Sequence, residues 1–407
     1  MMTTANTAPP GFARLGIVGT ILAVLGLIIL GITFAGAQGH PDLIKNLLQS
    51  YLYGWVLAML LSLGCYGFML LHYLSRGSWG IPVLRLFEAG AKCLPLLFLL
   101  FIPVLLGCKF LYPWTNHDLV YGNAALGMKP DEILLHRANY MSPLWFGART
   151  AGYFAIWSFF TFLLTRQSVR QDETGDGRLE IFRQKVSAVA FVIYFVTVSL
   201  AFTDWIMSLD SHWFSTIYGF WFVDFQGLAA IAFVSLIVCT HKISHKEPYN
   251  TLITQQVTRD LGNLMLTLTM IWAYFSLSQW LIIWSGNLPE EITFYLRRNS
   301  GTFLLVGAAN IILSFFVPFL ALLSGNTKRS PRLLAAVAVL VLIMRVVDIF
   351  WVVIPTSRHP IMPLLSDAGG ALFAVGAFLA VFSYCVRQVA IVPRHSTAIG
   401  QEAAAHG

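Results

Sequence analysis

Long apolar runs, separated by short polar segments, recur from one end of the chain to the other. Ten of them are about as long as the roughly 20 residues that a helix needs to cross the hydrocarbon core of a bilayer. They lie at 14–36, 51–74, 84–107, 144–166, 184–209, 213–240, 258–285, 300–323, 333–354 and 364–388. Because lipid offers the backbone no hydrogen bonds, spanning segments must be helices or closed barrels. The pattern predicts an all-α integral membrane protein with about ten transmembrane helices.

Composition and charge support this fold class. Of the 407 residues, 57% are hydrophobic and only 11% are charged, whereas a soluble domain carries about 25% charged residues. The net charge of +7 does not indicate nucleic-acid binding, because the basic residues gather in short loops. Their excess on one side of the predicted helices places both termini in the cytoplasm. The five cysteines include no Cys-x-x-Cys pair, and only His72 lies inside a span, so no metal or heme site is indicated.

A short internal repeat suggests how the spans are grouped. Residues 50–55, SYLYGW, open the second span, and residues 215–220, STIYGF, open the sixth. The same offset of four spans pairs Asp204 with Asp348, and a tryptophan follows each acid closely. The repeat predicts two four-helix bundles, spans 2–5 and 6–9, with two flanking helices, although interfacial aromatic residues could match by chance. The predicted domains are 1–50 (tail and flanking helix), 51–209 (first bundle), 210–354 (second bundle) and 355–407 (flanking helix and cytoplasmic tail).

Carboxylic acids inside or beside the spans are the candidate functional residues. An ionisable group in hydrocarbon costs about 2.5–3.5 kcal/mol on insertion scales, so each acid there is a candidate for function. Glu88 and Asp260 are expected toward the cytoplasm, and Asp204 and Asp348 toward the outside. Asp224 is expected roughly 16 Å along its helix, between the two levels. Because carboxyl groups in apolar surroundings can hold protons near neutral pH, the five acids predict a transmembrane proton path.

Several of these acids also have a purely structural interpretation. Glu88 and Lys92 are spaced i,i+4, and Arg345 and Asp348 are spaced i,i+3, so each pair could form a neutralising ion pair on one helix. Asp224 has no charged residue within one turn of its own helix, so it needs a partner elsewhere or must stay protonated.

The remaining polar candidates lie at helix ends. Asp210 is expected to cap the sixth helix, and Asp260 to favour the start of the seventh through the helix dipole. His212, in the turn between spans 5 and 6, is either interfacial or a proton exit group. Arg149, about one turn inside its span, needs a partner such as Asp204.

The stretch 202–219, FTDWIMSLDSHWFSTIYG, resembles the F subunit of bacterial alternative complex III, a quinol:electron-acceptor oxidoreductase. The ten-span layout and the SYLYGW motif extend the resemblance over essentially the whole chain, within the wider NrfD and polysulfide-reductase membrane-subunit family. The resemblance implies the two-bundle fold, a multi-pass location in the bacterial cytoplasmic (inner) membrane, and no covalently bound or metal-ligated cofactor in this chain. It implies hemes and iron–sulfur centres only in partner subunits.

The expected partners are a homologous quinol-binding membrane subunit, a multiheme cytochrome c subunit, an iron–sulfur subunit, small membrane subunits and lipid. Whether this copy binds menaquinol or another quinol stays open. Oxidation needs an electron acceptor near the quinol, and this chain supplies none, so it is not expected to be catalytic alone.

The expected function is therefore a membrane subunit that contributes a proton path to a quinol-oxidising complex. One alternative is a quinol-binding catalytic subunit, with His136 and Arg149 bordering an outer head-group pocket, although a surface position is also open for His136. The other is an independent secondary transporter, which should show paired Gly or Pro interruptions near the midplane. Pro95, Pro103 and Pro318 do not occupy equivalent positions in the two halves, which weakens that alternative.

Overall fold

The computed structural model describes residues 10–123, 126–299, 302–356, 358 and 364–393. These residues form helices joined by short loops, and the β-structure among them is a single isolated bridge between Asn123 and Met128. Nine helical segments in the described part of the chain are long and apolar enough to cross a membrane. The prediction of an all-α, multi-pass membrane protein is thus confirmed.

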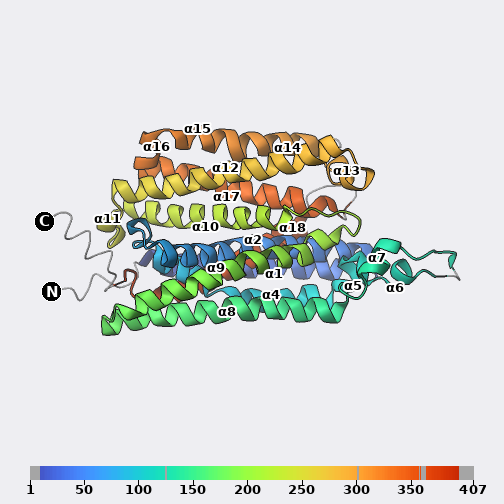
Figure 1. The fold of residues 1–407 in the computed structure, drawn as a ribbon, viewed down its shortest axis with the longest axis horizontal. Helices are drawn as coiled ribbons and strands as arrows, with labels where there is room; N and C mark the ends of the chain where they lie inside the picture. The colour runs from blue at the N-terminus through green and yellow to red at the C-terminus, as the bar shows by residue number, and fades with distance from the viewer. Residues whose placement is uncertain (1–9, 124–125, 300–301, 357, 359–363, 394–407) are drawn as a thin grey trace.

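The long helices follow the predicted spans in order (Figure 1). They are α1 (Pro10–Ala37), α2 (Pro41–Ser75), α3 (Leu84–Ala91) with α4 (Leu94–Leu106), α8 (Pro143–Thr174), α9 (Arg178–Trp205), α10 (Tyr218–Ile243), α12 (Gln255–Gly286), α14 (Thr302–Ile311) with α15 (Val317–Leu323), α17 (Pro331–Val353) and α18 (Leu365–Arg387). Short helices connect them: α5 (Cys108–Leu111), α6 (His117–Tyr121), α7 (Glu132–Arg137), α11 (Tyr249–Leu252), α13 (Pro289–Leu296) and α16 (Gly325–Arg329).

The predicted span 144–166 lies in α8, which is not among the nine most apolar segments. With 32 residues, α8 is nevertheless long enough to cross a bilayer. It packs against both α9 and α4, beside which it runs in Figure 1. Arg149 and Arg166, near the two ends of the predicted span, lower the mean hydropathy of this segment but do not shorten the helix.

Several predicted span boundaries were wrong, and two of the predicted spans are interrupted. The second helix begins at Pro41 instead of residue 51, and the sixth begins at Tyr218 instead of residue 213. The span 84–107 is interrupted at Lys92 and Cys93, because the proline at position 95 has no N–H and its ring clashes with the carbonyl group four residues earlier. The span 300–323, whose first two residues lie outside the described part, contains a π-helical segment, Ile312–Phe316, just before Pro318.

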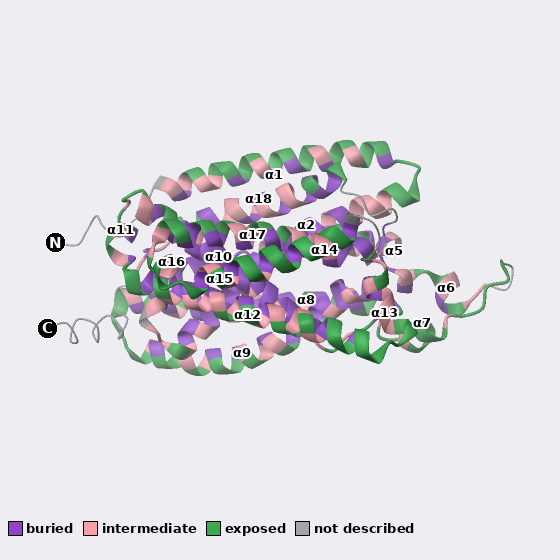
Figure 2. Ribbon diagram, turned by 90° about the horizontal axis from the view of Figure 1, so that it is seen from above, coloured by how far each residue is buried: buried purple, intermediate pink, exposed green. Residues whose placement is uncertain are grey.

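Helices α2 and α10 form the centre of the molecule. In their most apolar 18-residue windows, 94% and 83% of the residues are buried, against 17% in α1. Figure 2 shows the same contrast between the buried centre and the exposed outer face of α1. The outer helices expose large apolar side chains, such as Ile21 and Ile28 on α1 and Leu277 on α12, as helices in contact with lipid do.

The two ends of the bundle differ in structure. The connection between α4 and α8, which contains α5, α6 and α7, projects from one end, called here the α7 end (Figure 1). At the opposite end, called here the α11 end, the ring of Phe12 stacks on His241 at a centroid distance of 5.0 Å. The Ser383 hydroxyl donates a hydrogen bond to the Phe12 carbonyl group, so the start of α1 and the end of α18 lie together there.

The central helices contact spans of both predicted bundles, since α10 packs against α9 and α2 against α17. Helix α2 packs against α3, α4 and α9, and α10 packs against α12 and α17. The two central helices also pack against each other, while α1 and α18 pair along one side and contact α2. The domain boundaries at 51–209 and 210–354 stay a prediction, and the predicted tails at 1–9 and 394–407 lie outside the described residues.

The close approach of α2 and α10 depends on Gly64. A Cβ atom at this position would overlap the backbone carbonyl group of Gln226 on α10. Small residues at helix contacts allow such approach in membrane proteins, where packing rather than water drives helix association.

We expect Gly64→Ala to lower the stability of the folded chain by about 1–3 kcal/mol, because the central helices must move apart. The matched control is Gly152→Ala in α8, where an added Cβ meets no atom within 4 Å. Thermal unfolding of the two purified variants in detergent tests this, and equal melting temperatures would show that the contact does not limit stability.

Candidate functional site

Asp348, near the end of α17, is held by three other residues. The Trp272 indole Nε1 donates a hydrogen bond of 2.8 Å to Asp348 Oδ2, and the Asn310 amide donates one to Oδ1. The Arg345 guanidinium Nη1 lies 2.7 Å from Oδ2. The predicted i,i+3 ion pair is therefore present, and both of its members are buried.

Asp224 on α10 is also buried, but neither of its carboxylate oxygens has a hydrogen-bond partner among the described residues. The charged groups that act on it are Arg345 and Asp348 of the neighbouring α17. The Arg345 guanidinium lies 5.3 Å from the ring centre of Phe225 and 5.4 Å from that of Trp272. Asp224, Arg345 and Asp348 thus form one cluster, called here the acid cluster.

The acid cluster contains two carboxyl groups and one guanidinium. If both carboxyl groups were ionised, one negative charge would remain uncompensated in a buried site, which is costly. The cluster becomes neutral when a single proton is added to either acid. It therefore has the composition of a site that holds one proton.

The depth predicted for Asp224 was wrong. Because α10 begins at Tyr218, Asp224 lies six residues from its start, which is about 9 Å along the helix rather than 16 Å. Asp348 lies five residues before Val353, the last residue of the antiparallel α17. Both acids are therefore near the α7 end, at a similar depth, and Asp224 is not a step between the two levels.

Asp204 lies at the same end and is fully satisfied. Arg149 donates through Nε and Nη2 to its two oxygens at 2.8 and 3.2 Å, and the Tyr153 hydroxyl donates at 3.0 Å. The guanidinium also stacks on Tyr140 at 3.7 Å from the ring centre. The partnership of Arg149 and Asp204 considered from the sequence is thus present. His136, the other pocket candidate, is exposed on α7.

Glu88 lies in a second cluster, toward the α11 end. It accepts hydrogen bonds from Tyr73 at 2.5 Å and Ser168 at 2.8 Å, and Arg85 Nη1 lies 2.6 Å from its other oxygen. Arg85 also pairs with Asp172 of α8. The partner expected for Glu88, Lys92, instead occupies the partly exposed end of α3. Arg85 replaces it because its planar, forked guanidinium bridges two carboxylates, which an ammonium point charge does less well.

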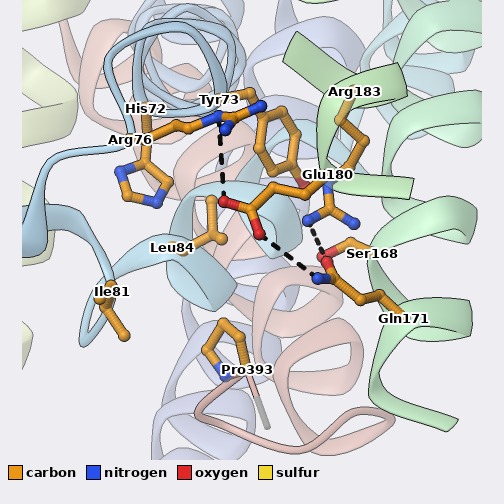
Figure 3. A pocket seen from close by; sticks show the side chains of 10 residues that line it. All are labelled: His72, Tyr73, Arg76, Ile81, Leu84, Ser168, Gln171, Glu180, Arg183 and Pro393. Carbon is orange, nitrogen blue, oxygen red and sulfur yellow. Dashed lines mark hydrogen bonds and ion pairs between the residues drawn. The ribbon is translucent and has the colours of Figure 1, made fainter. Parts of the chain in front are cut away.

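Polar side chains continue from this cluster toward the α11 surface. A cavity of about 30 Å³, large enough for one or two water molecules, lies beside Tyr73 and Ser168 (Figure 3). Across it, Glu180 approaches Arg76 at 3.9 Å and accepts a hydrogen bond from Gln171 at 3.5 Å. The buried acid Glu88 is therefore connected to the surface through polar groups.

Uncharged polar side chains lie between the two levels. Gln226 and Ser235 on α10 are fully buried, and their side-chain polar atoms have no partner among the described residues. On α9, Thr197 accepts a hydrogen bond of 2.8 Å from Trp157, and the ring of Tyr194 packs on Tyr66. A proton that crossed the centre would depend on these few groups and on water.

The remaining candidates lie at the ends of helices. His212 is exposed, and its Nε2 lies 2.8 Å from Asp131 Oδ2, next to α7. Asp260 is partly exposed and accepts hydrogen bonds from Gln256 on its own helix. Asp210 does not cap the sixth helix: it follows the 3₁₀ turn Met207–Leu209, eight residues before Tyr218, and pairs with Arg297 at 2.6 Å.

Arg298, two residues after the end of α13, is buried. Its guanidinium donates to the backbone carbonyl groups of Trp351, Phe294 and Val352 at 2.9, 2.6 and 2.7 Å. Burial lowers the pKa of Arg298 to about 9, so the group still carries its charge at neutral pH.

Sequence reasoning missed Arg85 as the partner of Glu88, and Asn310 and Trp272 as hydrogen-bond donors to Asp348. Arg85 and Asn310 are polar residues within apolar runs, a signal that could have identified them. Trp272 gave no such signal, because an indole in a membrane helix is common.

Among the described residues, no group of three or more His, Cys, Asp or Glu side chains is arranged to hold a metal ion. No protein-family model matches the chain, and no curated protein matches it.

We expect Arg345→Gln to destabilise the chain by about 3 kcal/mol or more, because it leaves two buried acids without their cation. The double variant Arg345→Gln, Asp348→Asn should recover much of that loss, since it removes one acid together with the cation. Arg332→Gln, at an exposed position of the same helix, is the control. Thermal unfolding of the purified chains measures all three, and a double variant no more stable than Arg345→Gln would contradict the charge balance.

Proposed function

We propose that the chain is a membrane subunit of a quinol-oxidising electron-transfer complex of the alternative complex III type, in the bacterial inner membrane. In this proposal the acid cluster of Asp224, Arg345 and Asp348 takes up and releases a proton during turnover. The resemblance of residues 202–219 to the F subunits of such complexes supports the type of complex. The arrangement of the acids supports the role within it.

The observation that carries the proposal is the state of Asp224. Its carboxyl group is buried, has no hydrogen-bond partner among the described residues, and lies in the electrostatic field of the Arg345–Asp348 ion pair. Buried acids usually have their oxygens satisfied, as those of Asp204 are, and Asp224 is an exception among the described residues. Loss or gain of one proton changes the charge of the acid cluster, and this is the property that a proton-transfer site needs.

The positions of the other acids support a route between the two sides. In the proposed orientation, the α11 end faces the cytoplasm, and Glu88 with its polar surroundings receives protons there. The acid cluster and Asp204 lie near the α7 end, which faces the outside. The apolar segment between them, interrupted by Gln226 and Ser235, is the part of the route that must open or admit water.

Redox chemistry is assigned to the partners in this proposal. Quinol oxidation releases two electrons and two protons, and hemes and iron–sulfur centres of partner subunits would accept the electrons. A homologous membrane subunit would bind the quinol that is oxidised, and small membrane subunits and lipid would complete the surroundings. This chain would act on the protons.

The transporter alternative gains little from the helix interruptions. The breaks lie at Lys92–Cys93 in the third span and at Ile312–Phe316 in the eighth, whereas a repeat of four spans pairs the third span with the seventh. The seventh, α12, is a continuous helix of 32 residues. Interruptions at unmatched positions do not provide the symmetric substrate site of a repeat-built transporter.

We expect Asp224→Asn and Asp204→Asn to leave the complex assembled but to lower the number of protons translocated per electron. The amide keeps the shape of each side chain and cannot carry the proton. Glu173→Gln, at an exposed position near the end of α8, is the matched control. The assay uses the purified complex in liposomes, with quinol oxidation and internal pH followed together.

A proton-to-electron ratio in Asp224→Asn equal to that of Glu173→Gln would remove the proposed role of the acid cluster. If only Asp224→Asn lowers the proton-to-electron ratio, proton transfer depends on the acid cluster, and the ion pair of Asp204 with Arg149 is structural.

A further inference from the structure

Two thiol groups that are far apart in the sequence meet toward the α11 end. Cys93 lies in the break between α3 and α4, and Cys385 lies two residues before the end of α18. A hydrogen bond joins the two thiols. The Cys93 sulfur also lies 4.0 Å from the carbonyl oxygen of Phe378 on α18. Cys93 and Cys385 are called here the thiol pair.

The two thiols differ in their access to solvent and lipid. Helix α18 packs against α3 and α4, on either side of the break, so Cys93 lies between these helices and is fully buried. Cys385 is partly exposed. A reagent that approaches from outside the bundle therefore meets Cys385 first and finds Cys93 behind it.

A cation lies beside the exposed member of the pair. Lys92, which does not hold the ion pair expected with Glu88, is partly exposed and is the charged group that acts on Cys385. The thiolate is the nucleophilic form of cysteine, and a neighbouring ammonium group stabilises that anion. Cys385 thus combines partial exposure, a cation and a second thiol, which are the features of cysteines that undergo reversible oxidation.

The other three cysteines lack this combination. Cys65 and Cys239 are fully buried in α2 and α10, where a thiol packs as a small apolar group. Cys108 is partly exposed and lies beside the ammonium group of Lys109, but the groups that act on its sulfur include no second thiol. Cys108 is therefore a natural control for a thiol that has a cation but no thiol partner.

A metal site explains the thiol pair less well than oxidation does. Structural zinc is held by four side chains, most often of Cys and His. In the described ranges of the chain, no group of three His, Cys, Asp or Glu side chains is arranged around a common point. Two thiols in hydrogen-bond contact are, by contrast, all that a disulfide requires from the protein.

We propose that the thiol pair is a site of reversible oxidation, at which a hydroperoxide such as hydrogen peroxide converts Cys93 and Cys385 to a disulfide. The bond would join the end of α18 to the break in the third span. Because Cys385 lies in the last turn of α18, movement of that turn is enough to close the bond. This inference goes beyond the proposed function and does not depend on it.

The oxidation takes place in two balanced steps. The Cys385 thiolate attacks one oxygen of hydrogen peroxide, the O–O bond breaks, and the leaving hydroxide takes up a proton, which gives a sulfenic acid and one water. The Cys93 sulfur then attacks the Cys385 sulfur, the S–O bond breaks, and the leaving hydroxide takes the Cys93 proton to form a second water. Each sulfur loses one electron and the peroxide gains two. A dithiol reductant reverses the reaction by thiol–disulfide exchange.

The test treats the purified full chain in phosphatidylcholine nanodiscs with hydrogen peroxide, and then counts the free thiols after denaturation with a maleimide. We expect the count to fall from the five of the reduced chain by two. Mass spectrometry of the digested protein should show a peptide cross-linked through Cys93 and Cys385, lighter by two hydrogen atoms. Dithiothreitol should restore all the thiols. A cross-link of Cys93 to Cys65, a bond between two chains, or no cross-link would overturn the inference.

Single substitutions separate the roles of the two thiols. Cys385→Ser should leave Cys93 reduced at peroxide concentrations that oxidise the unmodified chain, because Cys93 is buried. Cys93→Ser should stop the reaction at the sulfenic acid of Cys385, which dimedone traps. Cys108→Ser, the matched control, should form the disulfide as the unmodified chain does. Oxidation of Cys93 in the Cys385→Ser variant at the normal rate would contradict the proposed order of the steps.

Lys92→Gln tests the cation. We expect it to slow the loss of the two thiols about threefold or more, because less of Cys385 is then present as thiolate. Lys185→Gln, at an exposed position of α9, is its control. Equal rates in these two variants would show that Lys92 does not activate Cys385.

Thermal unfolding confirms that the variants fold and that the bond forms in the folded chain. Peroxide should raise the melting temperature of the unmodified chain and of Cys108→Ser, because the bond restrains the unfolded chain. It should leave those of Cys93→Ser and Cys385→Ser unchanged. A similar rise in all four proteins would mean that the stabilisation has another cause, and the inference would fail.

Discussion

The cost of an uncompensated charge away from water is the constraint on which the interior of this protein depends. Two completely buried acids meet it by pairing, Asp204 with Arg149 and Glu88 with Arg85. Each of these carboxylates also accepts hydrogen bonds from hydroxyl groups, which satisfy its remaining lone pairs. Asp224 departs from this pattern, because its oxygens have no partner among the described residues and the cation that acts on it, Arg345, already pairs with Asp348. A shared cation makes the charge of that cluster depend on one proton.

The helix packing buries these charged groups. Helices α2 and α10 lie at the centre, and Asp224 on α10 faces α17 within that core. The outer helices carry the apolar residues that contact the bilayer. The central helices can approach closely because Gly64 has no side chain to separate them. Packing and electrostatics therefore both depend on α10, which contacts α2 on one side and α17 on another.

Much of the fold could be predicted because a membrane helix is defined by its own apolar run. Spacing within one helix also predicted the ion pair of Arg345 and Asp348, and the cost of a lone charge in a span predicted a partner for Arg149. Contacts between helices were harder to predict. Glu88 pairs with Arg85 instead of Lys92, and this choice depends on Asp172 of another helix, which Arg85 also contacts. The depth of Asp224 depends on how residues 206–217 fold. A cavity beside Asp348 is lined by several separate segments of the chain, so no linear motif predicts it.

The most direct test of the central claim is infrared spectroscopy of the full chain, which detects the C=O stretch of protonated carboxyl groups. The acid cluster should give one such band at neutral pH, from a carboxyl group shielded from water. Asp224→Asn and Asp348→Asn should each remove the band, because either substitution leaves one acid and one guanidinium and no need for a proton. A band that persists in both variants, or a protein without this band, would contradict the claim that Asp224, Arg345 and Asp348 hold a single proton.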